Sequence, residues 1–281
     1  MMISGRSKQY VEWCGMEYQT IMATTADSGL GTIILNRPER RNAISILMRQ
    51  EISVCLTTWN KDDNEGCVIV TGAGSTFSSG LDLDEFKQVE RHPELLASSS
   101  RYHLDLWNFS KPTIAVINRP AMGGGCDLAC FCDIRIAAIS ASFGHPEIKF
   151  GAPPLYTPLR RIVGDGYTRD LCLTGRRIGS AEAMRIGLVS AVYEVEQLPE
   201  ESGKLAAAIL ESPADGLRYL KRTFVADSGN FEESFALEHD RAFREVTMTE
   251  HGSRPTGVSM RIICWSRSRR WTATCTVDVH T

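Results

Sequence analysis

The 281-residue sequence lacks the features that would tie it to a membrane or to nucleic acid. It contains no apolar run of the roughly eighteen residues that a membrane-spanning helix needs. Its net charge of −3 disfavours the strongly basic surface of a nucleic-acid-binding domain. The first fifteen residues have no apolar core of a secretory signal, although they faintly resemble a mitochondrial presequence. We therefore expect a cytoplasmic protein, or a mitochondrial matrix protein in a eukaryote.

Several signatures of nucleotide and nucleophile chemistry are also absent. The segment GAGSTF lacks the third glycine of a dinucleotide-binding turn, and no phosphate-binding P-loop motif occurs. No serine lies in a G-x-S-x-G motif, and there is no H-E-x-x-H zinc motif. These absences give no support for a nucleotide-binding turn, a serine nucleophile or a zinc site of these kinds.

The nine cysteines show no regular pairing pattern. Cys126, Cys130 and Cys132 lie close together, but no second group of cysteines or histidines at zinc-site spacing completes a metal site. Cys126 and Cys130 instead share one face of an apolar helix. We interpret these thiols as reduced and packed in the core.

Strand-like and helical segments alternate along most of the chain, which is 43% hydrophobic. The turn 27–29 between two β-branched runs predicts a hairpin, and Ser180 is predicted to cap a helix that follows a strand end near 171–174. The alternation predicts an α/β fold. The expected strands are 18–26, 29–36, 67–72, 113–118 and 134–139, and the expected helices are 46–60, 101–109 and most of 198–247.

The segment 112–147 carries the strongest chemical signal. An apolar strand leads through a proline turn into Gly123–Gly125, and a short apolar helix begins at once. Glycines at a helix start leave backbone N–H groups that a substrate atom can approach closely, and the helix dipole adds positive charge there. This arrangement can stabilise an oxyanion. Asp127 and Glu147 supply two carboxylates nearby for acid–base chemistry, although Asp127 could instead only cap the helix and Glu147 could be a surface ion-pair residue.

Five segments, in this order and spacing, resemble the enoyl-CoA hydratase/isomerase (crotonase) family from about Met16 to Thr247. The resemblance implies a spiral of repeated ββα units over 16–197 and a helical region at 198–247 that assembles trimers or dimers of trimers. The composition of the residues that follow, which lack a clean helical or strand period, predicts an irregular basic tail at 248–281. The segments are LNRPERRNA, TFSSGLDLDEF, AMGGGCDLACFCDIRIA, SFGHPEIKFG and LTGRRIGSAEAMRIGLVSAV.

The resemblance further implies an acyl-CoA thioester as substrate, with coenzyme A as part of it. The N–H groups of Leu81 and Gly124 would hold the thioester oxygen, and Asp127 and Glu147 would be the acidic pair. The family's hydratases usually carry Glu where Asp127 stands, and Asp is shorter by one C–C bond, about 1.5 Å. Some isomerases of the family carry Asp there. The implied reaction is hydration of a trans-2-enoyl-CoA by a lyase of fatty-acid metabolism, with double-bond isomerisation as the alternative.

Other residues are expected to contact the substrate. In the family the loop after Glu147 lines the acyl pocket, and here it reads GAPPLYTPLRR, with prolines in place of glycines. Tyr156 could offer a hydroxyl there or only pack, and His145 could act as an acid, although we expect it to have no chemical role. The residues assigned to substrate and CoA binding are Arg37, Arg40, Arg41, Ala43, Ser79, Gly80, Asp82, Gly123 and Tyr156, with Lys221 and Arg222 contributed by a neighbouring subunit.

Two readings of a different class remain open. The chain could be a catalytically idle protein of this fold that binds acyl-CoA, or one that binds RNA through its arginine-rich tail. The apolar faces of the C-terminal helices exceed what one helical layer would hide, which favours subunit contacts over a self-contained cap. These faces comprise Leu205, Ile209, Leu210, Leu217, Leu220, Phe224, Phe231, Phe235, Leu237 and Phe243.

Overall fold

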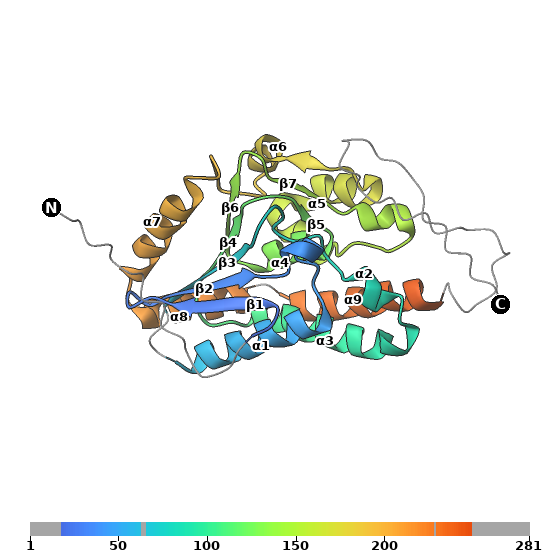
Figure 1. Ribbon diagram of the computed structural model, residues 1–281, viewed down its shortest axis with the longest axis horizontal. Coiled ribbons are helices and arrows are strands. Elements are labelled where there is room, and N and C mark those ends of the chain that lie inside the picture. The colour runs from blue at the N-terminus through green and yellow to red at the C-terminus, as the bar shows by residue number, and fades with distance from the viewer. Residues whose placement is uncertain (1–17, 63–65, 228, 249–281) are drawn as a thin grey trace.

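The computed structural model describes residues 18–62, 66–227 and 229–248, with side chains as far as Arg241 (Figure 1). The presequence-like start, the side chain of Phe243 and the tail beyond Met248 lie outside the described residues. In the part of the chain that is described, no helix is both long and apolar enough to cross a membrane.

The core is a six-stranded sheet whose strands lie in the order β1-β2-β3-β4-β6-β9. The first two strands form the predicted antiparallel hairpin around 27–29, and the other neighbours are parallel. Parallel neighbours need crossover connections, which helices supply, so the α/β class predicted from the alternation is confirmed. The strands are β1 (Ile21–Thr25), β2 (Leu30–Leu35), β3 (Cys67–Gly72), β4 (Thr113–Ile117), β6 (Ile134–Ala138) and β9 (Ala191–Tyr193).

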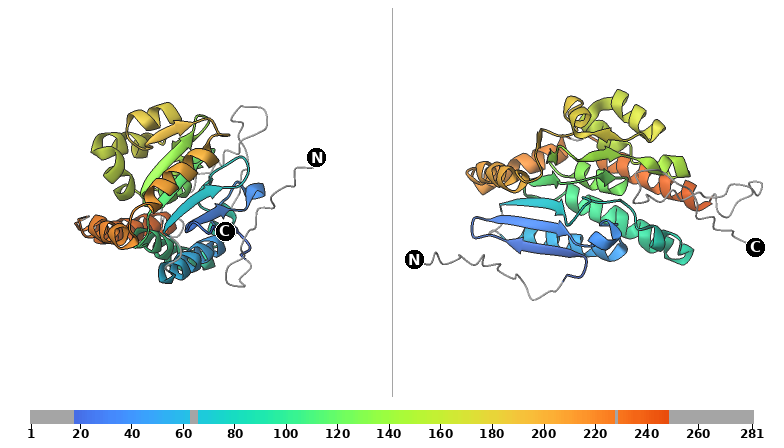
Figure 2. Two further views of the ribbon diagram at one scale, coloured as in Figure 1. Left: turned by 90° about the vertical axis from the view of Figure 1, so that its left-hand side faces the viewer. Right: turned by 45° about the horizontal axis from the view of Figure 1, so that its top comes forward.

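The central strands of the main sheet are buried on both faces because helices cover the sheet. Residues of β4 are all buried, as a continuous apolar strand requires. Figures 1 and 2 show α9 running alongside α3, while α7 packs against β3, β4 and β6. The α-helices are α1 (Ile46–Lys61), α2 (Leu83–Phe86), α3 (His92–Trp107), α4 (Gly124–Phe131), α5 (Thr157–Thr174), α6 (Ser180–Arg185), α7 (Leu198–Leu210), α8 (Ala214–Ala226) and α9 (Phe231–Met248).

A second, smaller sheet has the order β5-β7-β8, formed by β5 (Ala121–Met122), β7 (Ser142–Gly144) and β8 (Ile178–Gly179). The strands β5 and β7 are parallel, and Ser78 extends the arrangement through a parallel bridge to Ala121. Short 3-10 turns complete the described structure at Pro38–Arg40, Val89–Arg91 and Pro146–Phe150.

Two local predictions are wrong. The segment expected to end a strand near 171–174 is the last turn of α5, which closes on Gly175 in a left-handed conformation. Ser180 is the first residue of α6 rather than its cap, and its hydroxyl donates to the carbonyl of Ile139. The six described cysteines, Cys126, Cys130 and Cys132 among them, are free and buried, which confirms their assignment to the core.

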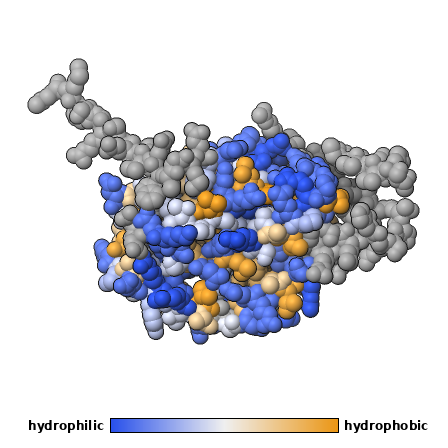
Figure 3. Space-filling model, turned by 90° about the horizontal axis from the view of Figure 1, so that it is seen from below, coloured by the Kyte–Doolittle hydropathy of each residue, from blue (hydrophilic) through white to orange (hydrophobic). Residues whose placement is uncertain are grey.

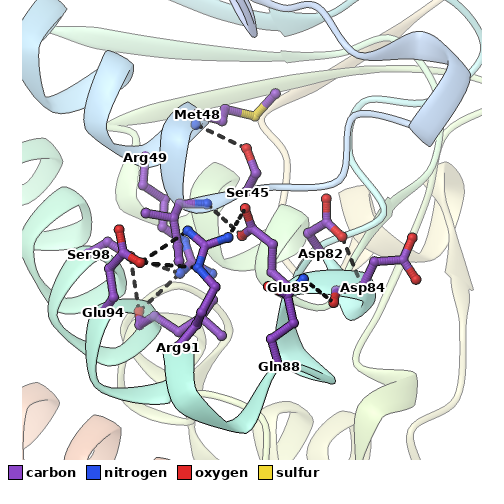
Figure 4. A network of polar contacts seen from close by, with 12 residues as sticks. Ser45, Met48, Arg49, Asp82, Asp84, Glu85, Gln88, Arg91, Glu94 and Ser98 are labelled. Carbon is purple, nitrogen blue, oxygen red and sulfur yellow. Dashed lines mark hydrogen bonds and ion pairs between the residues drawn. The ribbon is translucent and has the colours of Figure 1, made fainter.

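A polar network holds the short helix α2 between α1 and α3 (Figure 4). The buried guanidinium of Arg49 donates to the carbonyl of Leu95 at 3.0 Å and to the hydroxyl of Ser98 at 3.2 Å. Glu85 accepts the N–H of Ile46 at 2.8 Å and pairs with Arg91. These contacts therefore hold one side of the loop that precedes α2 in place.

The C-terminal helices divide into buried and exposed faces. Phe231 and Phe235 of α9 are buried and pack on Trp107 and Phe131, with the rings of Trp107 and Phe231 stacked 3.9 Å apart. By contrast, the apolar side chains left exposed on α8 and α9 are Tyr219, Leu220, Phe224 and Leu237. Some apolar side chains of these helices therefore pack in the chain's own core, and the others remain exposed.

An ion pair joins α8 to the main sheet. Lys221, only 5% exposed, donates to both carboxylate oxygens of Asp133 at 2.7 and 2.8 Å. The same carboxylate accepts the N–H and the hydroxyl of Thr113 at the start of β4. Its position between β4, β6 and α8 makes this pair a structural contact.

We predict that Lys221→Met lowers the free energy of unfolding measured in urea. Breaking a buried ion pair by removing one partner costs about 3–5 kcal/mol, and we expect the lower part of that range because the carboxylate of Asp133 is 22% exposed. The control is Lys204→Met on α7, where an exposed lysine pairs with Glu200 and Glu201. An exposed pair contributes about 0–1 kcal/mol. Equal losses in the two variants would contradict the assignment.

Candidate active site

Three segments of the chain run parallel and end at the same place. Ser78 pairs with Ala121, and β5 pairs with β7, with Met122 opposite Gly144. Because parallel segments leave a sheet at the same edge, the residues that follow each one meet there. These are Gly80 and Leu81 after the first segment, Gly123 and Gly124 after the second, and His145 and Glu147 after the third.

Two backbone N–H groups lie close together at this junction. The N–H of Ile44 donates to the carbonyl of Gly80 at 2.7 Å, and that of Asp82 donates to the carbonyl of Ile44. Because the carbonyl and the N–H of one trans peptide unit point in opposite directions, the N–H of Leu81 points away from Ile44. A Cβ placed on Gly124 would lie 3.6 Å from the nitrogen of Leu81. Gly124 is the first residue of α4, where an N–H has no acceptor inside the helix.

The glycines around this junction are required by close backbone approach. A Cβ on Gly80 would lie 2.7 Å from the carbonyl oxygen of Met122, and one on Gly125 would lie 2.6 Å from that of Ser78. Gly123 has a φ of 51°, and a Cβ there would press on the carboxylate of Glu147 at 3.1 Å. By contrast, a Cβ on Gly124 would make only ordinary contacts with the protein. Gly124 is thus the one glycine of Gly123–Gly125 at which a Cβ would meet only ordinary van der Waals contacts.

The two predicted carboxylates lie next to this junction, and a histidine lies between them. Asp127 is buried on α4, one turn after Gly123, and Glu147 lies in the 3-10 turn after His145. The Nδ1 atom of His145 is 2.9 Å from Oε1 of Glu147, and its Nε2 atom is 3.9 Å from Oδ1 of Asp127. The cap of α4 is Gly123, so the alternative that Asp127 serves only as its cap is not supported.

Unpartnered atoms of all three side chains are buried at this point. In the described residues no hydrogen-bond partner meets Oδ1 of Asp127, Nε2 of His145 or Oε2 of Glu147. Buried polar atoms without partners are costly in a finished fold, and they are typical of a site that a substrate or water completes. The cluster therefore has open positions for proton transfer beside the two N–H groups.

Burial and charge shift the titration of this group. Desolvation raises the pKa of Asp127 well above its usual value, and the charge of Glu147 adds to this, while that of His145 opposes it. Burial alone would lower the pKa of His145, but the carboxylate of Asp127 and the hydrogen bond to Glu147 outweigh it and raise the pKa to about 9. Both shifts favour the protonated form. At neutral pH, Asp127 and His145 together therefore hold one more proton than the same two side chains would hold in water. One nitrogen or oxygen atom from each of the three side chains lies within 4.8 Å of the other two.

The arginines assigned to CoA binding are mostly engaged within the protein. Arg37 donates to Oδ2 of Asp82 at 2.8 Å and to the carbonyl of Ala43, while the other oxygen of Asp82 caps α2. Arg40 pairs with Asp84 at the surface. Asp82 and Arg37 therefore hold the loop that carries Leu81, and their expected contact with CoA stays a prediction. Exposed positions remain at Arg41 and Ser79.

Two assignments are corrected. The hydroxyl of Tyr156 donates to Asp165 at 2.7 Å on the exposed side of α5, so it does not serve as a pocket hydroxyl here. Lys221 is buried against Asp133, and its ammonium is not free to bind a phosphate. Its neighbour Arg222 is exposed on α8. Its binding to the CoA of a neighbouring subunit stays a prediction.

From the sequence we expected no chemical role for His145, and nothing indicated Glu238, yet the structure places both at or beside the site. His145 precedes Glu147 by two positions, and that spacing was the available signal, although it does not show which way the ring turns. Glu238 of α9 accepts the N–H groups of Tyr156 and Thr157 and so caps α5. No local pattern reveals a contact between residues about eighty positions apart.

Comparison with known proteins places this geometry in a family. The model of the enoyl-CoA hydratase/isomerase family matches residues 25–261. The chain is 35% identical over 244 residues to a probable enoyl-CoA hydratase of Mycobacterium tuberculosis, covering 85% of this chain and 93% of that protein. It is 35% identical over 208 residues to a hydroxycinnamoyl-CoA hydratase-lyase of Pseudomonas fluorescens, covering 70% and 75%.

A solved structure shows the same fold. An enoyl-CoA hydratase/isomerase from Xanthobacter autotrophicus Py2 superposes with a TM-score of 0.76 at 32% identity, covering 82% of this chain and 88% of the other. The match of the family model to most of the chain, the fold and the relatives agree with the motifs read from the sequence. The chain belongs to the enoyl-CoA hydratase/isomerase family.

Proposed function

We propose that this protein is a lyase that hydrates a trans-2-enoyl-CoA through a thioester enolate. The observation that carries the proposal is the meeting of the N–H groups of Leu81 and Gly124 with the carboxylates of Asp127 and Glu147. Donors that face the atom where charge develops lower the barrier more than any uniform binding contact. The names of the relatives support hydration of CoA thioesters. The substrate supplies coenzyme A, and the proposal needs no cofactor of the protein's own.

The proposed steps balance as the addition of one water. Glu147 takes a proton from water as the water oxygen bonds to C3, and the π electrons of the C2–C3 bond move to the thioester oxygen. The N–H groups of Leu81 and Gly124 hold that oxygen. Asp127 positions the water during this attack. The enolate then collapses as C2 takes a proton from the acidic pair, which returns the pair to its starting protonation state. Double-bond isomerisation uses the same enolate and needs only one well-placed carboxylate.

A panel of enoyl-CoA and acyl-CoA thioesters, read by mass spectrometry, tests the reaction. Gain of one water supports hydration, and a shifted double bond without a mass change supports isomerisation. Binding without turnover would support the idle alternative. RNA binding through the tail would instead weaken steeply with salt and disappear when the chain is cut after Thr247.

We predict that Glu147→Gln lowers turnover by about 10²-fold or more while CoA-ester binding stays nearly unchanged, because the amide cannot accept the proton of water. Asp127→Asn should also slow hydration but should affect isomerisation less. Steady-state kinetics and binding on the substrate found by the panel check both variants. Wild-type rates in the Glu147 variant would contradict the assignment.

We predict that Gly124→Val weakens catalysis by about 10²–10³-fold, the scale of losing one oxyanion donor, because its side chain would occupy the space beside the N–H group. The fold should survive, since a Cβ there meets only ordinary contacts. Gly125→Ala is the contrasting variant: its Cβ would lie 2.6 Å from a backbone oxygen, so stability itself should fall. A folded and fully active Gly124→Val would refute the oxyanion role.

We also propose that 198–247 mediate assembly into trimers or dimers of trimers, with 16–197 as the catalytic core. The exposed apolar side chains of α8 and α9 support this. On the face that Figure 3 shows, apolar groups lie scattered among hydrophilic ones. Such exposed groups are typical of subunit contacts, and closed symmetry is the common outcome. We propose the cytoplasm as its compartment, with the mitochondrial matrix as the alternative.

We predict a trimer or hexamer in sedimentation velocity at micromolar concentration. Phe224→Glu, which adds a charge to the exposed face of α8, should shift the protein toward smaller species because a charge is costly to bury at an interface. Thr223→Glu on the same helix is the control for an added charge. An active monomer of 31 kDa in the wild type would contradict the proposal.

A further inference from the structure

His145 is the most buried ionisable group of the site that the proposed mechanism does not use. It is 1% exposed, and its ring lies between the two carboxylates. A histidine that only fills space in a core usually finds neutral partners for its nitrogens. Here both nitrogens face carboxylate oxygens, one at 2.9 Å and the other at 3.9 Å.

The contact with Glu147 selects which carboxylate oxygen is available. The Nδ1–H of His145 donates to Oε1, so Oε2 is left as the buried oxygen without a partner. A Cβ on Gly123 would lie 3.1 Å from that same Oε2, which places it at the glycine turn next to Gly124. A carboxylate held by one oxygen presents the other in a fixed direction, and a fixed direction is what proton transfer to a bound substrate needs.

The Nε2 side of the His145 ring faces Asp127, the shorter of the two acids. The carboxyl of Asp127 stands 3.9 Å from Nε2, which leaves both atoms without a direct bond in the described structure. Two carboxylates this close to each other in a buried site repel, and a positively charged ring between them relieves that repulsion. Cys130 of α4 acts on both residues, and Glu238 of α9 acts on Asp127. Tyr102 of α3, Cys126 of α4 and Cys172 of α5 also interact with the charge of Asp127. None of these groups is cationic.

We propose that His145 is a positioning residue of the active site, which orients Glu147 for attack and shares with Asp127 the proton that keeps the two acids from repelling each other. The proposal rests on the proposed function for its kinetic consequence, but its structural part does not depend on the reaction. It adds a third member to the acidic pair.

The variants His145→Asn and His145→Leu separate the two contacts. The Asn amide can still donate from the position of Nδ1 to Glu147, but it has no group at the position of Nε2 and does not titrate. Leu removes both contacts. We expect kcat at pH 7 to fall about 10-fold for Asn and about 10²-fold for Leu, with KM changed by less than about two-fold because neither contact is to the CoA ester.

The pH profile distinguishes positioning from a purely structural role. The raised pKa of His145 means that the proton is present below the ordinary value of 6.5 and is lost as the pH rises through about 9. Wild-type kcat should therefore fall on the alkaline side near pH 9, and this limb should disappear or move by at least one pH unit in His145→Asn. The control is His92→Asn, a buried histidine on α3 outside the site, which should keep the limb. A His145→Asn variant with the wild-type limb would overturn the proposal.

A second measurement needs no substrate. In isotope-labelled protein, the imidazole resonance that His145→Asn removes should titrate near pH 9, and it should titrate at lower pH in both Asp127→Asn and Glu147→Gln. This result would stand even if the substrate panel assigned another reaction, so the two proposals fail separately. Titration of His145 near 6.5, unchanged by either variant, would overturn the positioning role.

Discussion

The active site depends on the parallel alignment of three short segments: the chain at Ser78, the strand β5 and the strand β7. Parallel pairing sends each chain out of the sheet at the same edge. Leu81, Gly124 and Glu147 therefore meet although they are far apart in the sequence. The glycines at 80, 123 and 125 permit the close approach, because a side chain at any of them would collide with backbone or with Glu147.

Electrostatics completes what the backbone arranges. The junction offers partial positive charge from two N–H groups and places a buried cluster of two acids and one histidine beside it. Isolated buried carboxylates would lose their charge, so the protons shared within the cluster decide its state. The pair of Arg37 and Asp82 holds the loop that carries Leu81, and the pair of Lys221 and Asp133 joins α8 to the main sheet. Charged residues that the sequence suggested as CoA-binding groups thus hold parts of the protein together.

The sequence predicts the elements with local signals and misses those set by distant contacts. The hairpin at 27–29 and the helix after Gly123 follow from turn residues and apolar periodicity, and both are present. The segment 171–174 was mistaken for a strand end because apolar residues at the end of a helix resemble a short strand. The roles of Lys221, Tyr156 and Glu238 could not be predicted, since their partners are fixed only by tertiary packing. The orientation of His145 is of the same kind: its spacing from Glu147 is visible, but the direction of its ring is not.

The most direct test of the central claim is the polarisation of a bound thioester. An enoyl-CoA labelled with ¹³C at the thioester carbonyl would be bound to Glu147→Gln, which should hold the substrate without turning it over. If Leu81 and Gly124 donate to the carbonyl oxygen, the ¹³C resonance should move downfield on binding, and the shift should be lost when Gly124→Val is added. A saturated complex whose carbonyl resonance stays at its position in water would contradict the claim that these two N–H groups form the oxyanion pocket.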